Sequence, residues 1–168
     1  MPVFVGLLRA VNVGGTGKLP MAELRALCEA AGFANPRTYI ASGNVLFEAQ
    51  APEAAVKVAL ERALEAYAGK PVGVMVRTGS EMKGIVAANP FPAAPANRVV
   101  AIFLDDSPPA NALAGVTGRQ EEEIALGARE IYVHYGSGMA QSKLKIPAAR
   151  RGTARNMNTV AKLAACAT

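Results

Sequence analysis

The chain has 168 residues, of which 51% are hydrophobic and 18% are charged. This length suggests one domain or two small joined lobes, and the apolar content excludes a wholly disordered or fibrous protein. The formal net charge is +5, but residues 131–168 contain six Lys and Arg and no acid, whereas residues 1–130 contain all 13 Asp and Glu. This asymmetry suggests contact with an anion, the alternative being a charged surface that only keeps the segment soluble.

Three features of the sequence predict a cytoplasmic protein with no membrane contact. The longest strongly apolar run, residues 3–8, is far shorter than the roughly 20 residues that cross a bilayer. No basic segment precedes this run, as one would in a signal peptide. The two cysteines, Cys28 and Cys166, give no disulfide framework, which suits a reducing compartment.

The first half of the chain alternates strand and helix patterns in the order β-α-β-β-α-β, which is the ferredoxin-like arrangement. Apolar residues recur in the helices at spacings of three and four, and Gly43-Asn44 fits a type II′ turn between the two middle strands. The predicted elements are strands over residues 3–8, 37–41, 45–48 and 72–77 and helices over residues 20–32 and 52–69.

The second half of the chain is less regular. Three prolines in residues 89–96 indicate a linker, and a strand–helix–hairpin–helix series follows it. This series is compatible with a degenerate second ferredoxin-like unit, although we find no residue-level repeat. The predicted elements are helices over residues 81–88, 109–113, 141–144 and 158–165 and strands over residues 99–104, 123–126 and 130–135.

Together these patterns predict an α+β protein of two lobes. A ferredoxin-like lobe, residues 1–78, packs against a smaller α/β lobe, residues 79–168, which carries the basic C-terminal segment. The centre of the first sheet is apolar on both faces, and two helices cover only one of them. Burying the second face saves several kcal/mol at about 25 cal/mol per Å², so we expect the second lobe or a dimer partner to cover it. We assign Phe4, Leu8, Leu46 and Met75 to this second face.

Four segments of the chain carry recognisable motifs, namely Leu7-Leu-Arg-Ala-Val-Asn-Val-Gly-Gly15, Met21-Ala-Glu-Leu-Arg25, Thr38-Tyr-Ile-Ala-Ser-Gly-Asn-Val45 and Ala154-Arg-Asn-Met-Asn-Thr-Val160. This set resembles the bacterial family called domain of unknown function 1697, over nearly the whole chain. Two positions depart from the family pattern, which usually has Gly in place of Ala10 and often Trp in place of Met157. The resemblance implies a fold and a set of positions to inspect, and it implies no reaction.

The glycine-rich loop after the first strand is the first candidate site. Gly14 and Gly15 precede a helix, where backbone N–H groups can bind an anion. Arg9 and Lys18 add positive charge to this loop. It is not a Walker loop, because Asn12 stands where that pattern requires its first glycine. The alternative is a tight connection in which the glycines only permit positive φ.

The segment before the last helix is the second candidate site. Asn158 or Thr159 would cap the helix, but capping does not explain Arg155 or Asn156, whose planar groups suit carboxylate or phosphate. If this segment folds back beside the glycine-rich loop, the two border one basic pocket. The predicted ligand-binding residues are then Arg9, Asn12, Gly14, Gly15, Lys18, Arg155 and Asn156.

The residues suited to catalysis or metal binding are few. His134 is the sole histidine and shares a strand face with Tyr132, and with no acid near it we interpret it as a surface residue. The sequence has no His/Cys cluster with metal-ligand spacing, and Asp105-Asp106, followed by two prolines, is interpreted as a turn. We therefore expect no metal and no cofactor.

The sequence thus favours non-catalytic binding of an anionic ligand in a basic cleft, the ligand being a nucleotide, a nucleic-acid backbone or an acidic small molecule. One alternative is an enzyme acting on a phosphorylated or carboxylated small molecule, with Arg9 and Arg155 as clamps and His134 as the proton carrier. The other is a homodimeric interaction module without a ligand. The sequence is compatible with a monomer or a homodimer.

Overall fold

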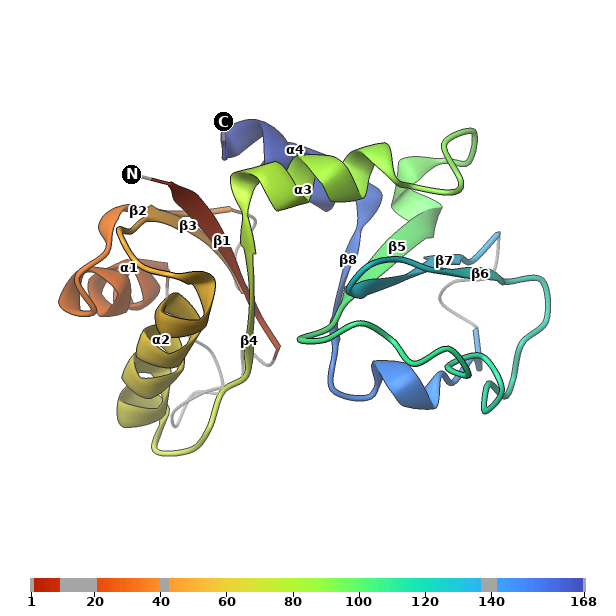
Figure 1. Ribbon diagram of the computed structural model, residues 1–168, viewed down its shortest axis with the longest axis horizontal. Helices are drawn as coiled ribbons and strands as arrows, with labels where there is room; N and C mark the ends of the chain where they lie inside the picture. Colours follow the sequence, from red (N-terminus) through yellow and green to blue (C-terminus); the bar gives the residue numbers. More distant parts are fainter. Residues whose placement is uncertain (1, 10–20, 40–42, 137–141, 168) are drawn as a thin grey trace. The chain divides into compact units, whose positions relative to one another are not determined.

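The computed structural model describes residues 2–9, 21–39, 43–136 and 142–167 (Figure 1). The chain forms two compact units, Met1–Lys83 with Leu163–Thr168 and Gly84–Lys162. The division falls inside two helices, α3 (Gly79–Ala87) and α4 (Met157–Cys166). The last residues of the chain therefore belong to the first unit. No helix in the described ranges has the length and apolar content needed to cross a membrane.

The first unit is a ferredoxin-like βαββαβ unit, as predicted. Its four strands form an antiparallel sheet in the order β2-β3-β1-β4, and both of its main helices lie on one side of that sheet (Figure 1). The elements are β1 (Val3–Leu8), α1 (Met21–Ala30), β2 (Ala34–Thr38), β3 (Asn44–Glu48), α2 (Glu53–Ala68) and β4 (Val74–Thr78).

The position of β2 is the main difference from the predicted elements of this unit. The strand runs over Ala34–Thr38 rather than residues 37–41. Its register with β3 shifts between Ala34 and Arg37, around Pro36. Proline is tolerated at a sheet edge or a bulge because it has no N–H to donate to the ladder. The residues that join β2 to β3 include 40–42, so the predicted turn lies partly outside the described residues.

The main core of the first unit lies between the sheet and its two helices. On α2, Val56, Leu60 and Leu64 recur every four residues and are fully buried, which places them on one helix face. They pack in one cluster with Phe47 of β3 and Phe33, whose rings are stacked at a centroid distance of 4.3 Å.

The second face of this sheet is also buried, but its composition differs from the predicted one. Phe4 and Leu8 pack in the cluster with α1 and α2. Leu46 lies opposite Val5 in the β1–β3 register, and directly opposed residues share a face, so Phe4 and Leu8 were wrongly grouped with it. The second face consists of Val5, Leu7, Leu46, Met75 and Arg77, each at most 3% exposed.

A close backbone approach joins the C-terminal residues to the first unit. At Gly79, the first residue of α3, an added Cβ atom would lie 2.6 Å from the carbonyl oxygen of Ala167. Only glycine permits this spacing, because the neighbouring atom is backbone and cannot turn aside.

The second unit repeats the strand order of the first. Its sheet has the order β6-β7-β5-β8, in which β5 to β8 take the places of β1 to β4. This confirms the second, degenerate ferredoxin-like unit. The elements are a 3-10 turn η1 (Ala96–Arg98), β5 (Val99–Phe103), β6 (Glu123–Leu126), β7 (Glu130–His134), a 3-10 turn η3 (Pro147–Ala149) and β8 (Thr153–Asn156), followed by α4.

Irregular chain replaces the covering helices in the second unit. Residues 110–115 form turns, so the short helix predicted over residues 109–113 was wrong, and residues 142–144 are not helical either. Leu144 and Ile146 nevertheless pack on the apolar cluster of β5 and β7 side chains that includes Ile102 and Val133. The irregular segment with Leu144 and Ile146 thus covers one face of the second sheet, as α1 and α2 cover one face of the first.

Candidate functional site

Arg155 lies on β8, directly opposite Ala101 of β5. Its Nη1 donates hydrogen bonds to Thr153 Oγ1 at 2.7 Å and to the carbonyl oxygen of Ala154 at 2.9 Å. The side chain is half-buried, and burial lowers the pKa of Arg155 to about 10. The guanidinium therefore stays charged at neutral pH but is less well hydrated than a surface arginine. Such a cation gains more from a nearby negative charge than an exposed one does.

Asn156 caps α4. Its Oδ1 accepts a hydrogen bond from the backbone N–H of Thr159 at 3.0 Å, and α4 begins at Met157. The prediction that Asn158 or Thr159 is the cap was therefore wrong, because the helix starts one residue earlier than its apolar pattern indicated. One acceptor of Asn156 is committed to the helix, and its amide N–H groups are the donors suited to a ligand.

Arg9 lies in the first unit, just after β1, and is exposed. Its backbone N–H donates to the carbonyl oxygen of Gly73 at 2.8 Å, and its side-chain carbons lie beside Gly73. Gly73 also lines a pocket of about 190 Å³ whose charged residues are Glu61 and Glu65. The part of the described surface next to Arg9 therefore includes carboxylates, which restricts where an anion can approach it.

The rest of the predicted pocket stays a prediction. Asn12, Gly14, Gly15 and Lys18 lie outside the described residues. Arg9 belongs to the first unit, whereas the segment Arg155-Asn156 belongs to the second.

The basic C-terminal region presents most of its charge to solvent. Leu144 and Ile146 face the core of the second unit, and the residues on either side of them point outward. Five of the six cations in residues 131–168 are exposed, and only Arg155 is half-buried. The exposed ones are Lys143, Lys145, Arg150, Arg151 and Lys162.

Arg77 is a residue that the sequence interpretation passed over. It lies on β4 opposite Val5, is 1% exposed, and donates from Nη1 to the carbonyl oxygen of Val76 at 3.0 Å. The signal that could have found it is a charged residue at the same strand parity as Met75, in an otherwise apolar strand. Charged side chains at core positions are rare unless they are hydrogen-bonded.

Arg77 and Arg155 occupy equivalent places in the two units. Each lies on the fourth strand of its sheet, opposite the central strand and two residues before a helix. The residue between arginine and helix is the cap in both. Thr78 Oγ1 accepts from the N–H of Glu81 at 3.1 Å, and the Glu81 carboxylate accepts from the N–H of Thr78 at 2.9 Å, which is a capping box. The halves thus share an arginine–cap–helix motif.

His134 does have an acid beside it, contrary to the prediction. Glu123 lies opposite it across the β6–β7 pair, with Oε1 3.3 Å from His134 Nδ1. The ring of Phe91 lies 5.6 Å away. The carboxylate can orient the imidazole ring, although Glu123 itself is largely exposed.

Cys28 has a structural role. Cys28 is fully buried, and burial, with a smaller effect of Glu29, raises the pKa of its thiol to about 12, so it is a poor nucleophile. Within the described ranges, no three His, Cys, Asp or Glu side chains gather as a metal site.

Comparison with protein families decides the relationship that the motifs suggested. Residues 1–132 match the family described as "Protein of unknown function (DUF1697)". The chain belongs to this family. The DUF1697 match ends before β8 and α4, so the segment with Arg155 and Asn156 lies outside the matched residues.

A solved structure supports the fold of this DUF1697 member over its full length. The conserved bacterial protein SP0830 from Streptococcus pneumoniae is 22% identical to the chain, with a TM-score of 0.82. The similarity covers 99% of each chain. At this identity the likeness establishes the fold alone. A search of curated proteins found no match.

Proposed function

We propose that the protein binds an anionic ligand without transforming it, and that Arg155 is the principal contact. The observation that carries the proposal is the half-buried guanidinium of Arg155, at the end of the strand that leads into α4. Partial burial makes its charge poorly hydrated, and a phosphate or carboxylate can accept two parallel hydrogen bonds from its planar fork.

The charge of the C-terminal region that contains Arg155 supports an anion rather than a cation. Residues 131–168 contain six Lys and Arg and no acid, and five of these cations are exposed. Their summed field attracts anions toward this part of the second unit. In the proposal, the amide of Asn156 donates a second hydrogen bond to the ligand.

Three ligand classes fit this chemistry, and the salt dependence of the affinity separates a nucleic-acid backbone from the other two. A nucleic-acid backbone releases several counterions on binding, so its affinity falls steeply between about 50 and 200 mM salt. A nucleotide or an acidic small molecule makes fewer contacts, so its affinity depends less on salt.

The similar Streptococcus pneumoniae chain supports a bacterial origin, and the free cysteines support a cytoplasmic location.

The test is a titration of the full chain with ATP, a heparin oligosaccharide and citrate at two salt concentrations. We expect at least one probe to bind, and Arg155→Ala to weaken that binding about tenfold. Arg155→Lys keeps the charge without the planar fork, so its affinity should lie between those of the wild type and Arg155→Ala. Lys70→Ala, which removes an exposed cation of the first unit, is the control and should bind as the wild type does.

Two outcomes overturn the proposal. Unchanged affinity of folded Arg155→Ala for every probe that binds the wild type removes Arg155 from the site. A wild-type chain that binds none of the probes and forms a dimer in solution instead supports an interaction module without a ligand.

An enzyme is the second candidate, and one observation favours it. Glu123 Oε1 lies 3.3 Å from His134 Nδ1, so the carboxylate can orient the imidazole ring. In that case Arg155 holds a phosphorylated or carboxylated substrate and His134 moves the proton. Loss of turnover of a phosphorylated probe in both His134→Gln and Glu123→Gln is the result that this candidate requires.

A further inference from the structure

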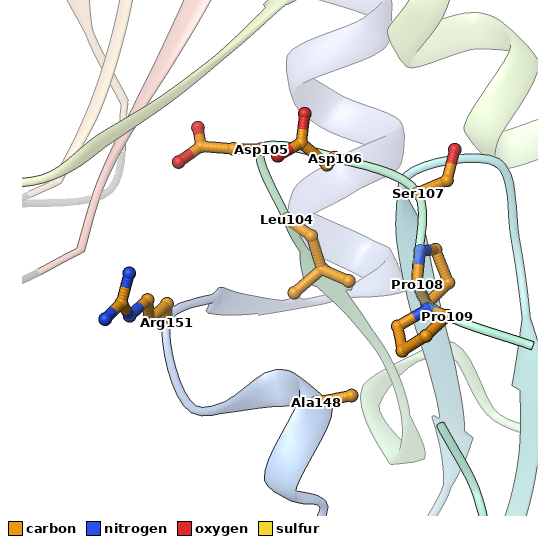
Figure 2. Close-up of a pocket in the computed structure, with 8 residues that line it drawn as sticks. All are labelled: Leu104, Asp105, Asp106, Ser107, Pro108, Pro109, Ala148 and Arg151. Atoms are coloured by element: carbon orange, nitrogen blue, oxygen red, sulfur yellow. The ribbon is translucent and has the colours of Figure 1, made fainter. Parts of the chain in front are cut away.

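A second pocket lies at the end of β5. Arg155 does not line it, and its charged lining residues are of both signs. It has a volume of about 240 Å³. Figure 2 shows the side chains of Asp105 and Arg151 extending to one side of Leu104, with Pro108 and Pro109 on the other side. The remaining lining residues are Asp106, Ser107 and Ala148.

Backbone contacts fix the two segments that form this pocket. Gly152, next to Arg151, lies so close to β5 that an added Cβ atom would be 2.7 Å from the carbonyl oxygen of Phe103. Glycine is therefore required for the Arg151 segment to approach the strand end. On the other side, the N–H of Leu104 donates to the carbonyl oxygen of Arg129 at 2.9 Å.

The loop after β5 is stiff as well as anchored. Pro108 and Pro109 have fixed φ angles, which limits the conformations of the chain between the strand and the turns that follow. A wall of this kind loses little conformational entropy when a ligand binds, so the pocket is largely preformed.

The charges in the pocket have opposite signs and come from opposite segments. Asp105 and Asp106 follow β5, whereas Arg151 follows η3. A ligand with a single charge would meet at least one like charge here, which disfavours simple anions and simple cations. A ligand with an ammonium and a carboxylate can satisfy both.

From this arrangement we infer that the pocket binds a free α-amino acid with an aliphatic side chain. The ligand carboxylate binds Arg151, the ammonium binds Asp106 with Asp105, and the side chain contacts Leu104 and the two prolines. The volume supports this size class. At about 30 Å³ per water molecule it holds about eight waters, and it is smaller than the pockets of roughly 300–1,000 Å³ that hold drug-sized ligands.

The test compares L-leucine with its two singly charged analogues, isopentylamine and 4-methylpentanoate, by calorimetry and by the amide NMR spectrum of the full chain. We expect L-leucine to bind and to shift the amide signals of residues 104–107 and 148–152. Each analogue lacks one charge-assisted contact and should bind about tenfold more weakly.

Variants at exposed positions then assign the charges. Arg151→Gln should weaken L-leucine about tenfold and remove its advantage over isopentylamine, and Asp106→Asn should remove its advantage over 4-methylpentanoate. Lys145→Gln and Glu29→Gln change exposed charges outside the pocket and are the matched controls. Arg155→Ala should leave L-leucine binding unchanged, which separates this pocket from the proposed anion site.

Three results overturn the inference. They are the absence of any amide shift at residues 104–107 and 148–152 with L-leucine, equal affinity for L-leucine and either analogue, and a loss of affinity in the control variants as large as in Arg151→Gln.

Discussion

The ends of β4 and β8 have the same arginine–cap–helix motif in two different environments. In each, an arginine precedes a capping residue and a helix, and the arginine lies opposite the central strand. Arg77 is 1% exposed, whereas Arg155 is half-buried and its pKa falls to about 10. The comparison teaches that topology places the guanidinium and that local burial decides how far solvent can reach it.

The two units also differ in how they cover their sheets. In the first unit α1 and α2 supply the covering side chains, whereas in the second the irregular segment with Leu144 and Ile146 does so. The strand order is the same in both. A four-stranded order therefore persists when helices are replaced by coil, provided that the coil still buries apolar side chains.

The largest expected effect separates the two arginines. Arg77→Ala should lower the free energy of unfolding by about 3 kcal/mol, because it empties a fully buried site and removes the hydrogen bond to Val76. Arg155→Ala, at a half-buried site, should cost less than about 1 kcal/mol. Urea denaturation of the two variants and the wild type measures both values. If the two substitutions cost the same, burial does not distinguish the motifs.

A smaller effect is expected at the two caps. Thr78→Ala and Asn156→Ala should each cost about 1 kcal/mol, because each leaves a helix N–H without its side-chain acceptor. Thr78→Ser and Asn156→Asp retain an acceptor and are the controls. Thermal unfolding of the four variants measures this. A cost at one cap alone would show that only one of the helices depends on its motif.

The sequence predicted the four strands of the first unit and β5, β6 and β7 of the second, because apolar runs and glycine or proline breaks mark them. It did not predict β8 (Thr153–Asn156), because this strand is short and polar and carries no apolar run. It did not predict that Phe4 and Leu8 lie on the helix-covered face of the first sheet. Alternation along one strand gives two faces, but the cross-strand register is needed to match them to the faces of the neighbouring strands. It missed Arg77, since a lone arginine at a strand end is ordinary in sequence and exceptional only when its burial is known. The cap was misplaced because the start of α4 differs by one residue from its apolar pattern.

For the candidate site, the sequence identified Arg155 and Asn156 as chemically suitable but could not give their burial or bonding. The pocket at Asp105 and Arg151 was not visible in the sequence, since the two segments are far apart along the chain and meet only through β5 and Gly152. Asp105-Asp106 alone is indistinguishable from an ordinary turn. The pocket depends on contacts between segments that are distant in the sequence, and no local sequence pattern indicates such contacts.

A further expected effect concerns pH and again compares the units. Burial raises the pKa of Cys28 in the first unit from 9.0 to about 12, with a smaller effect of Glu29. Burial also raises the pKa of Tyr132 in the second unit from 10.0 to about 12, with a smaller effect of Glu130. The Tyr132 hydroxyl donates to the carbonyl oxygen of Ile85 at 2.9 Å, which holds its proton in the folded state.

Both groups keep their protons longer in the folded chain than in the unfolded one, so each contributes stability that is complete below its ordinary pKa and is lost as pH rises above it. We therefore expect the free energy of unfolding to begin falling near pH 9 because of Cys28 and to fall more steeply above pH 10 because of Tyr132. Denaturation at pH 8, 9.5 and 10.5, in roughly equal steps across these values, measures the slope. Cys28→Ala should flatten both intervals, and Tyr132→Phe mainly the second. A slope that neither substitution changes would mean that the alkaline loss of stability arises from other groups and does not distinguish the two cores.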